Sequence, residues 1–137
     1  MIKYNMIADR DCMRTCIASI LELAPIAIPD FMDKNPDDPW PHVQRWLASQ
    51  GLIAWFTPFD GSASLEQVLG SINNINPGVY YLIGGRGAYE DHMVVALGDK
   101  IVHDPSRLSP GLTGPASNGF WLVVTLVTAT LRDHAPS

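Results

Sequence analysis

The spacing of apolar residues changes halfway along this chain, and that change limits the fold more than any other feature of the sequence. Over residues 11–76, apolar side chains recur every three or four positions, as in helices that bury one face, with a short apolar strand at 52–56. From residue 79 the pattern becomes runs of β-branched and aromatic residues between glycine-containing turns, which is typical of strands. Helices followed by strands predict an α+β fold.

Three helices are expected in the first part. The first begins after Asp11, whose carboxylate is expected to cap it, and ends near Ala24, because a residue before proline disfavours the helical conformation. The second lies within residues 40–50, and the third follows Ser64 as its N-cap. Residues 25–41 contain five prolines and are interpreted as a surface connection with a turn or two.

The second part predicts an antiparallel sheet. Its runs are apolar on both faces, so a layer is expected to cover each side of the sheet, with the helices on at least one. A proline- and glycine-rich loop over residues 106–119 is long enough to be suspected of a function. The expected strands span residues 79–83, 92–97, 100–103 and 120–127.

Length and charge narrow the functional classes. At 137 residues the chain is expected to form a single domain, residues 1–137. The net charge of −5 and the lack of a Lys/Arg cluster argue against nucleic acid or an anionic membrane surface as a partner. No run approaches membrane-spanning length and no secretory signal is visible, which predicts a cytoplasmic protein. The oligomeric state is left open.

Cys12 is the first candidate for chemistry. It lies in the first turn of the first expected helix, whereas Cys16 lies on its apolar face. Cysteine attacks as thiolate, and the positive end of a helix dipole can lower a thiol pKa from about 8.5 into a range of roughly 3.5–7.5. Cys12 is therefore a candidate nucleophile. A structural role stays open for it and is expected for Cys16, because free cysteines are commonly buried.

A thiol nucleophile needs a base and a group that orients that base. His92 begins an apolar strand, and His103 lies just before Asp104 near the end of the next one, while the other two histidines are expected to be solvated. A three-residue turn over 98–100 would place Asp104 on the sheet face that carries His92, and a two-residue turn would reverse this. The alternative of an interior His92 and an Asp104 that only opens a turn stays open.

Taken in order, these pieces resemble the papain-like cysteine peptidase superfamily, and within it small bacterial forms similar to the C39 peptidases that process bacteriocins. Residues 11–18 (Asp-Cys-Met-Arg-Thr-Cys-Ile-Ala) are similar to that family's Asp-Cys-Gly-x-x-Cys-Leu-Ala motif, with Met13 in place of the glycine. Residues 92–95 are similar to its His-x-Val-Val strand, and residues 104–105 to its Asp-Pro. The layout over residues 10–112 also resembles uncharacterised papain-like proteins of phages and bacteria.

The resemblance implies a papain-like fold and a Cys-His-Asp site. In that site Cys12 attacks an amide carbonyl to form a thioester, His92 acts as general base and then acid, and Asp104 fixes the tautomer of the imidazole. The family supplies an oxyanion donor from a glutamine shortly before the cysteine, and no glutamine precedes Cys12 here. Asn5 is the only amide side chain upstream, so Asn5 and the backbone N–H of Cys12 are the candidate donors.

The leading hypothesis is therefore a thiol hydrolase or acyl-transferase, with a peptide or protein as the expected substrate and no metal or cofactor. The same residues would also serve a deamidase, a γ-glutamyl transferase or a thioesterase. The alternative from another class is a catalytically degenerate relative that serves as a phage or bacterial binding or accessory protein. A metal site built from Cys12, Cys16 and a histidine is the third interpretation. The sequence leaves open whether residues 106–119 cover the site.

Overall fold

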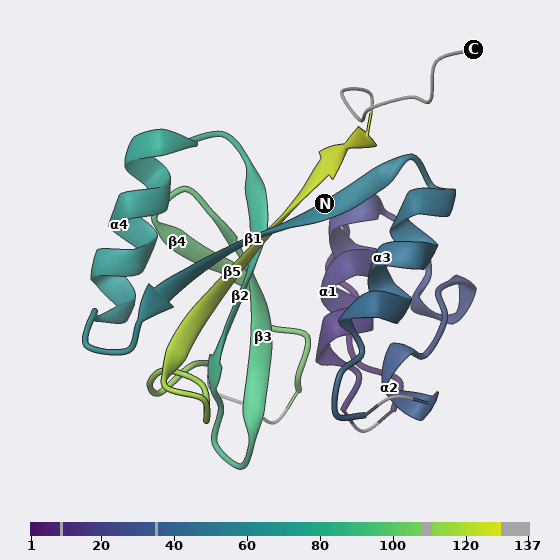
Figure 1. Cartoon of the computed structure of the whole chain (residues 1–137), viewed down its shortest axis with the longest axis horizontal. Coiled ribbons are helices and arrows are strands. Elements are labelled where there is room, and N and C mark those ends of the chain that lie inside the picture. Colours follow the sequence, from purple (N-terminus) through teal and green to yellow (C-terminus); the bar gives the residue numbers. More distant parts are fainter. Residues whose placement is uncertain (9, 35, 108–110, 130–137) are drawn as a thin grey trace.

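The structure, a computed structural model, describes residues 1–8, 10–34, 36–107 and 111–129 (Figure 1). Its helical segments are α1 (Cys12–Leu21), the 3₁₀ turn η1 (Pro25–Ala27), α2 (Phe31–Lys34), α3 (Trp40–Ser49) and α4 (Leu65–Ile75). Its strands are β1 (Leu52–Asp60), β2 (Tyr80–Arg86), β3 (Asp91–Leu97), β4 (Lys100–His103) and β5 (Phe120–Thr128). They form one sheet in the order β1-β5-β2-β3-β4, with antiparallel neighbours. The prediction of helices packed against an antiparallel sheet in an α+β fold is confirmed.

Helices cover both faces of this sheet, with α1 and α3 on one side and α4 on the other (Figure 1). Strand β3 shows how one segment serves both cores. Met93 and Val95 pack in the cluster formed with α1 and α3, whereas Val94 and Ala96 pack in the cluster formed with α4. Successive side chains of a strand point to opposite faces, so burial on both sides accounts for the unbroken apolar run.

The helix ends follow local signals. At the start of α4, the backbone N–H of Gln67 donates to Ser64 Oγ at 3.1 Å and the Ser64 N–H donates to Gln67 Oε1 at 2.8 Å. This reciprocal pair is a capping box, and it confirms Ser64 as the N-cap. Helix α1 ends at Leu21, earlier than predicted, because Glu22 takes the left-handed conformation with φ 58°.

The proline-rich connection over residues 25–41 is more ordered than predicted. It contains η1 and α2, and it buries Pro25, Ile28 and Phe31. These three residues are spaced three apart, so they share one side of a compact, turning segment that packs against the core. Prolines alone indicate a loop, but the apolar residues spaced three apart between them give this segment a buried side.

Strand β1 is an edge of the sheet, and it pairs with β5 over the whole of Leu52–Asp60 rather than over the predicted residues 52–56. Its outer backbone is partly covered by a side chain of α3. Gln44 Oε1 accepts from the Ala54 N–H and Gln44 Nε2 donates to the Ala54 carbonyl, both at 2.9 Å. Pro58, which lacks an N–H, is tolerated because it lies on an edge strand.

The turn between β3 and β4 is shorter than predicted, but Asp104 still has the predicted register relative to β3. Leu97 pairs with Lys100, so the turn has two residues, Gly98 and Asp99, and not the three over 98–100 on which the expected register rested. A register shift follows, because Ala96 pairs with Ile101 but Val95 pairs with His103. The extra residue at this β-bulge restores the register that a three-residue turn would have given from His103 onward.

Within the described part of the chain, none of the helices has the length and the apolar character that crossing a bilayer requires.

Candidate active site

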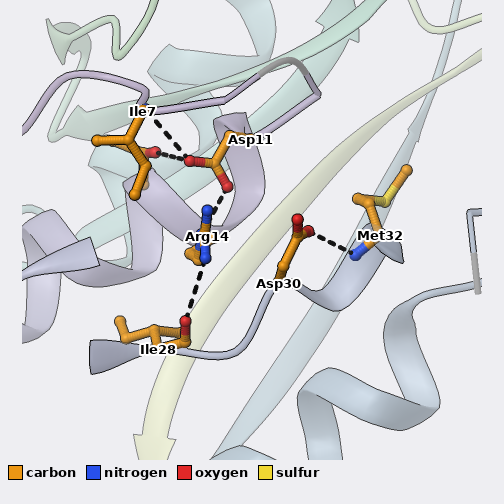
Figure 2. A network of polar contacts seen from close by, with 7 residues as sticks. Ile7, Asp11, Arg14, Ile28, Asp30 and Met32 are labelled. Atoms are coloured by element: carbon orange, nitrogen blue, oxygen red, sulfur yellow. Dashed lines mark hydrogen bonds and ion pairs between the residues drawn. The ribbon is translucent and has the colours of Figure 1, made fainter. Parts of the chain in front are cut away.

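The start of α1 is held by a buried network that the sequence did not predict (Figure 2). Asp11 is the residue before the helix, but its side chain makes no capping hydrogen bond. Its carboxylate instead accepts from Arg14 Nε at 2.6 Å and, more weakly, from the Ile7 N–H at 3.4 Å. Arg14 Nη1 in turn donates to the Ile28 carbonyl at 3.3 Å. The expectation of an Asp11 cap was wrong, because a guanidinium three residues later lies within reach and is buried with it.

Both sulfurs of α1 face the main chain of one residue on β3. Cys16 is fully buried, and its thiol donates to the Met93 carbonyl at 3.5 Å. The sulfur of Cys12, one helical turn earlier, has a main-chain hydrogen bond from Met93. Met93 follows His92 directly along β3.

The thiol of Cys12 is not activated in the way the sequence suggested. Burial raises the pKa of Cys12 above its usual value, and the carboxylate of Glu90 adds to the rise. Main-chain hydrogen bonds from Met93 and Met13 act in the opposite direction and do not reverse it. The expected lowering of the pKa by the helix N-terminus was therefore wrong, because loss of water around the sulfur outweighs it. Ionisation of Cys12 needs a base that takes the proton.

His92 and Asp104 are paired. His92 Nε2 lies 2.7 Å from Asp104 Oδ1, and that oxygen also accepts from the Ser106 N–H at 3.0 Å. The imidazole is almost fully buried, with a side-chain exposure of 9%. The pair leaves Nδ1 as the ring nitrogen that can take a proton, because Nε2 is committed to the carboxylate. His103 is used differently, since its Nε2 lies 2.5 Å from the Tyr4 carbonyl.

Two contacts that sequence reasoning missed hold His92 in position. A Cβ on Gly87 would lie 2.9 Å from Cβ of His92, so only glycine allows the turn before β3 to lie against that side chain. Asp91 ties the same end of the strand to the 106–119 loop, because Asp91 Oδ1 accepts from the Ser117 N–H at 2.9 Å and Oδ2 from the Ser117 hydroxyl at 2.6 Å. In the sequence, the contact between Asp91 and Ser117 is indicated only by an aspartate before the histidine and by a serine in a turn-rich loop.

Cys12 and His92 line the same cleft, which has a volume of about 700 Å³. The cleft is bounded by α1, by the segment between α2 and α3, by the ends of β2 and β3, and by residues 116–118 of the loop. Four of the five methionines of the chain line it, namely Met6, Met13, Met32 and Met93. Methionine is flexible and polarizable, so this lining can adapt to ligands of different shape.

The structure argues against Asn5 as a donor for oxyanion stabilisation and brings forward a different residue. Asn5 is exposed and is not among the described residues that line the cleft. Arg10, which the sequence analysis did not consider, lines the cleft and has a left-handed backbone with φ 58°. Its Nε lies 3.5 Å from Glu90 Oε2. Nothing in the residue pattern marked Arg10, because a positive φ at a residue other than glycine is not visible in a sequence.

Among the described residues, no group of three or more His, Cys, Asp or Glu side chains is arranged to hold a metal ion. Cys12 and Cys16 are both free thiols.

Comparison with family models, with curated proteins and with solved structures gave no match.

Proposed function

We propose that this protein is a thiol hydrolase or acyl-transferase of papain-like type that cuts or transfers an amide bond. The observation that carries the proposal is one cleft that contains Cys12 and His92, with His92 Nε2 bound to Asp104 Oδ1 at 2.7 Å. Nucleophile, base and orienting acid are the three parts that thiol catalysis needs. Their order along the chain is that of the papain-like motifs.

The reaction follows from these contacts. Nδ1 of His92 takes the proton of the Cys12 thiol, and the sulfur attacks the substrate carbonyl carbon to form a tetrahedral oxyanion. Collapse of that intermediate breaks the C–N bond, and the amine leaves with the proton from His92. Water then hydrolyses the thioester, or a second amine takes the acyl group. The Asp104 carboxylate stabilises the imidazolium and fixes its orientation throughout.

The cleft supports a peptide or a protein segment as the substrate. Its volume of about 700 Å³ lies in the range of typical ligand sites. Its lining combines flexible methionines with the polar ends of two strands, which suits a chain that alternates apolar side chains with amide groups. Both cysteines are free, which agrees with the proposed cytoplasmic location, where thiols stay reduced.

One observation favours a second function. Burial and the Glu90 carboxylate raise the pKa of Cys12, so the resting thiol keeps its proton. A protein that has kept the fold and the cleft but lost turnover would show the same resting state. The alternative is thus a binding or accessory protein of a phage or a bacterium, which uses the cleft to hold a peptide without cutting it.

Alkylation of Cys12 by iodoacetamide separates these two functions. In an enzyme, His92 assists ionisation, so at pH 7 Cys12 is expected to react about tenfold or more faster than a cysteine in an unfolded peptide. His92→Ala is expected to remove this advantage. The measurement is the second-order rate constant, obtained by intact-mass spectrometry with peptide mapping of the labelled residue.

Two internal controls accompany this experiment. Cys16 is fully buried and is expected to stay unlabelled in the folded protein. His42, a histidine of α3 that does not line the cleft, is replaced in His42→Gln as the matched variant, and the rate is expected to stay unchanged. Labelling of Cys12 at the rate of an ordinary or a slower thiol, equal in wild type and His92→Ala, contradicts the enzyme and favours the binding protein.

A further inference from the structure

We propose that Arg10 stabilises the oxyanion in this cleft, by donating guanidinium N–H groups to the substrate carbonyl oxygen as negative charge develops on it. This inference rests on the proposed function. It goes beyond it by naming a catalytic residue outside the set of Cys12, His92 and Asp104. It also replaces the sequence-based candidate Asn5, which is exposed and does not line the cleft.

The first support is the position of Arg10. It precedes Cys12 by two residues and lines the same cleft. The residue between them, Asp11, is 3% exposed and is fixed by its 2.6 Å contact with Arg14. Figure 2 shows how this contact holds the backbone at the start of α1. The main chain of Arg10 is therefore tied to the helix turn that carries the nucleophile.

The second support is the backbone conformation. Arg10 has a φ of 58°, which places a residue other than glycine in the left-handed region. That conformation is unfavourable, because Cβ approaches the following carbonyl oxygen. Such outliers cluster at active sites, where a side chain has to be aimed in a direction that a relaxed backbone does not give. Here the conformation accompanies a long cationic side chain on the cleft wall.

The third support is the availability of the guanidinium. Its Nε lies 3.5 Å from Glu90 Oε2, and the side chains of Arg10 and Glu90 are 61% and 56% exposed. Exposed ion pairs of this kind contribute little to stability, so substrate can compete for the guanidinium. A guanidinium carries five N–H donors, and its charge is permanent. Within the described part of the chain, the guanidinium is engaged only through Nε, so the two terminal nitrogens can donate to an oxyanion.

Other N–H donors on the described cleft wall are placed less well. Asn118 lies in the loop before β5, and its Oδ1 accepts from the Phe120 N–H at 3.1 Å. The ring of Trp40 packs edge-on against Phe56 with centroids 4.8 Å apart. Arg86 is carried by the end of β2. Only Arg10 belongs to the chain segment that leads directly into Cys12.

Two reagents distinguish an oxyanion donor from a residue that merely supports the fold. Acylation of Cys12 by p-nitrophenyl acetate forms a C–S bond through a tetrahedral oxyanion and then expels p-nitrophenolate, while His92 takes the thiol proton. Alkylation by iodoacetamide displaces iodide at a tetrahedral carbon and forms no oxyanion. Both reactions consume the same thiolate, so the ratio of the two rate constants is independent of the thiol pKa. Cys12→Ala gives the background of each reaction.

In Arg10→Ala the acylation-to-alkylation ratio is expected to fall about tenfold or more, somewhat less than the 10²–10³ lost with a fully buried donor. Arg10→Lys is expected to restore part of the ratio, because it keeps the charge but not the fork of donors. Arg45→Ala removes an equal charge from the exposed side of α3, outside the cleft, and is expected to leave the ratio within about twofold.

The outcomes separate this inference from the proposed function. An unchanged ratio in Arg10→Ala overturns the role of Arg10, as does a wild-type protein that alkylates rapidly but is not acylated. An equal loss in Arg10→Ala and Arg45→Ala also overturns it, because a general field effect would then be responsible. A wild-type Cys12 that reacts slowly with both reagents overturns the proposed function, and the role of Arg10 with it.

Discussion

The protonation of Cys12 depends on neighbours that act in opposite directions. Burial and the Glu90 carboxylate raise the pKa of the thiol, while main-chain hydrogen bonds from Met93 and Met13 lower it. Glu90 also pairs with Arg10 at 3.5 Å. One carboxylate therefore touches the proposed oxyanion donor and acts on the nucleophile, which makes Glu90 the residue through which the resting reactivity can be altered most simply.

Replacement of this carboxylate tests that coupling. Glu90→Gln is expected to lower the pKa of Cys12, because the negative charge that disfavours the thiolate is removed. At a pH below the thiol pKa, alkylation by iodoacetamide is then expected to be about two- to fivefold faster. The increase is small because solvent screens the partly exposed charge of Glu90. The measurement is the pH profile of the alkylation rate.

Glu66→Gln is the matched control for Glu90→Gln. Glu66 lies on the exposed side of α4, on the other face of the sheet from α1, so its replacement is expected to leave the profile unchanged. A profile that is identical in wild type and Glu90→Gln contradicts the electrostatic coupling between Glu90 and Cys12.

The sequence identified some site residues and not others, for physical reasons. Cys12, His92 and Asp104 were predictable because each is a chemically distinctive residue at the end of a regular element. The structure brings Cys12 and His92 to one cleft and pairs His92 with Asp104. The predicted cap at Asp11 is wrong because Arg14, three residues on, binds the Asp11 carboxylate. Arg10 was missed because its placement depends on a backbone dihedral angle.

At the scale of the element, the hairpin of β3 and β4 shows that apolar patterns predict strands but not the length of the turn between them. The strands were predicted from their apolar runs, and β4 has the expected bounds of 100–103. The turn length was not predicted. The turn has two residues, Gly98 and Asp99, and the β-bulge that follows it contains no glycine that would mark it in the sequence. Asp104 reaches His92 because these two departures compensate, and neither departure alone would have kept them together.

The outer edge of β1 gives a stability prediction. Gln44→Ala removes both hydrogen bonds to Ala54 and leaves a partly buried N–H and carbonyl without partners. The free energy of unfolding is expected to fall by about 1–2 kcal/mol. Urea unfolding followed by circular dichroism measures this. Gln50→Ala is the matched control, because Gln50 is exposed and its side chain has, among the described residues, a single hydrogen bond, from Nε2 to the Ser49 hydroxyl at 3.2 Å. Equal midpoints for the two variants would contradict the prediction.

At the scale of the whole molecule, the cleft lies where segments distant in sequence meet. It draws on the lead-in to α1, the turn before α3, the ends of β2 and β3, and the loop before β5. The layers of the fold were predictable, because periodicity reports which faces are buried. The shape of the cleft was not, because it depends on how those layers fit together. The 106–119 loop illustrates this, since Asp91 holds Ser117 on the cleft wall.

The α4 side of the sheet gives a pH prediction for the fold. Burial raises the pKa of Tyr81 to about 12, with a further rise from Asp99, while its hydroxyl donates to the Gly98 carbonyl at 2.7 Å. An unfolded tyrosine ionises near pH 10. Between about pH 10 and 12 the unfolded chain therefore loses a proton that the folded chain keeps, so stability falls as the pH rises.

Tyr81→Phe is expected to flatten this decline. Between pH 9 and 11 the variant is expected to lose less unfolding free energy than wild type, by at most about 1 kcal/mol after allowance for solvent screening. Urea unfolding at several pH values measures the slope. Tyr89→Phe serves as the control, because Tyr89 is 91% exposed and its slope is expected to match wild type. Parallel slopes for Tyr81→Phe and wild type would contradict the assignment.

The contact between α1 and β3 has a consequence for how such a protein can diverge. Cys12 and Cys16 both have hydrogen bonds with the peptide groups of Met93. The side chain of Met93 is meanwhile part of the cleft wall. Over evolutionary time, exchange of Met93 for another apolar residue would therefore remodel the cleft wall, while both sulfurs keep hydrogen-bond partners in the main chain, which every amino acid possesses.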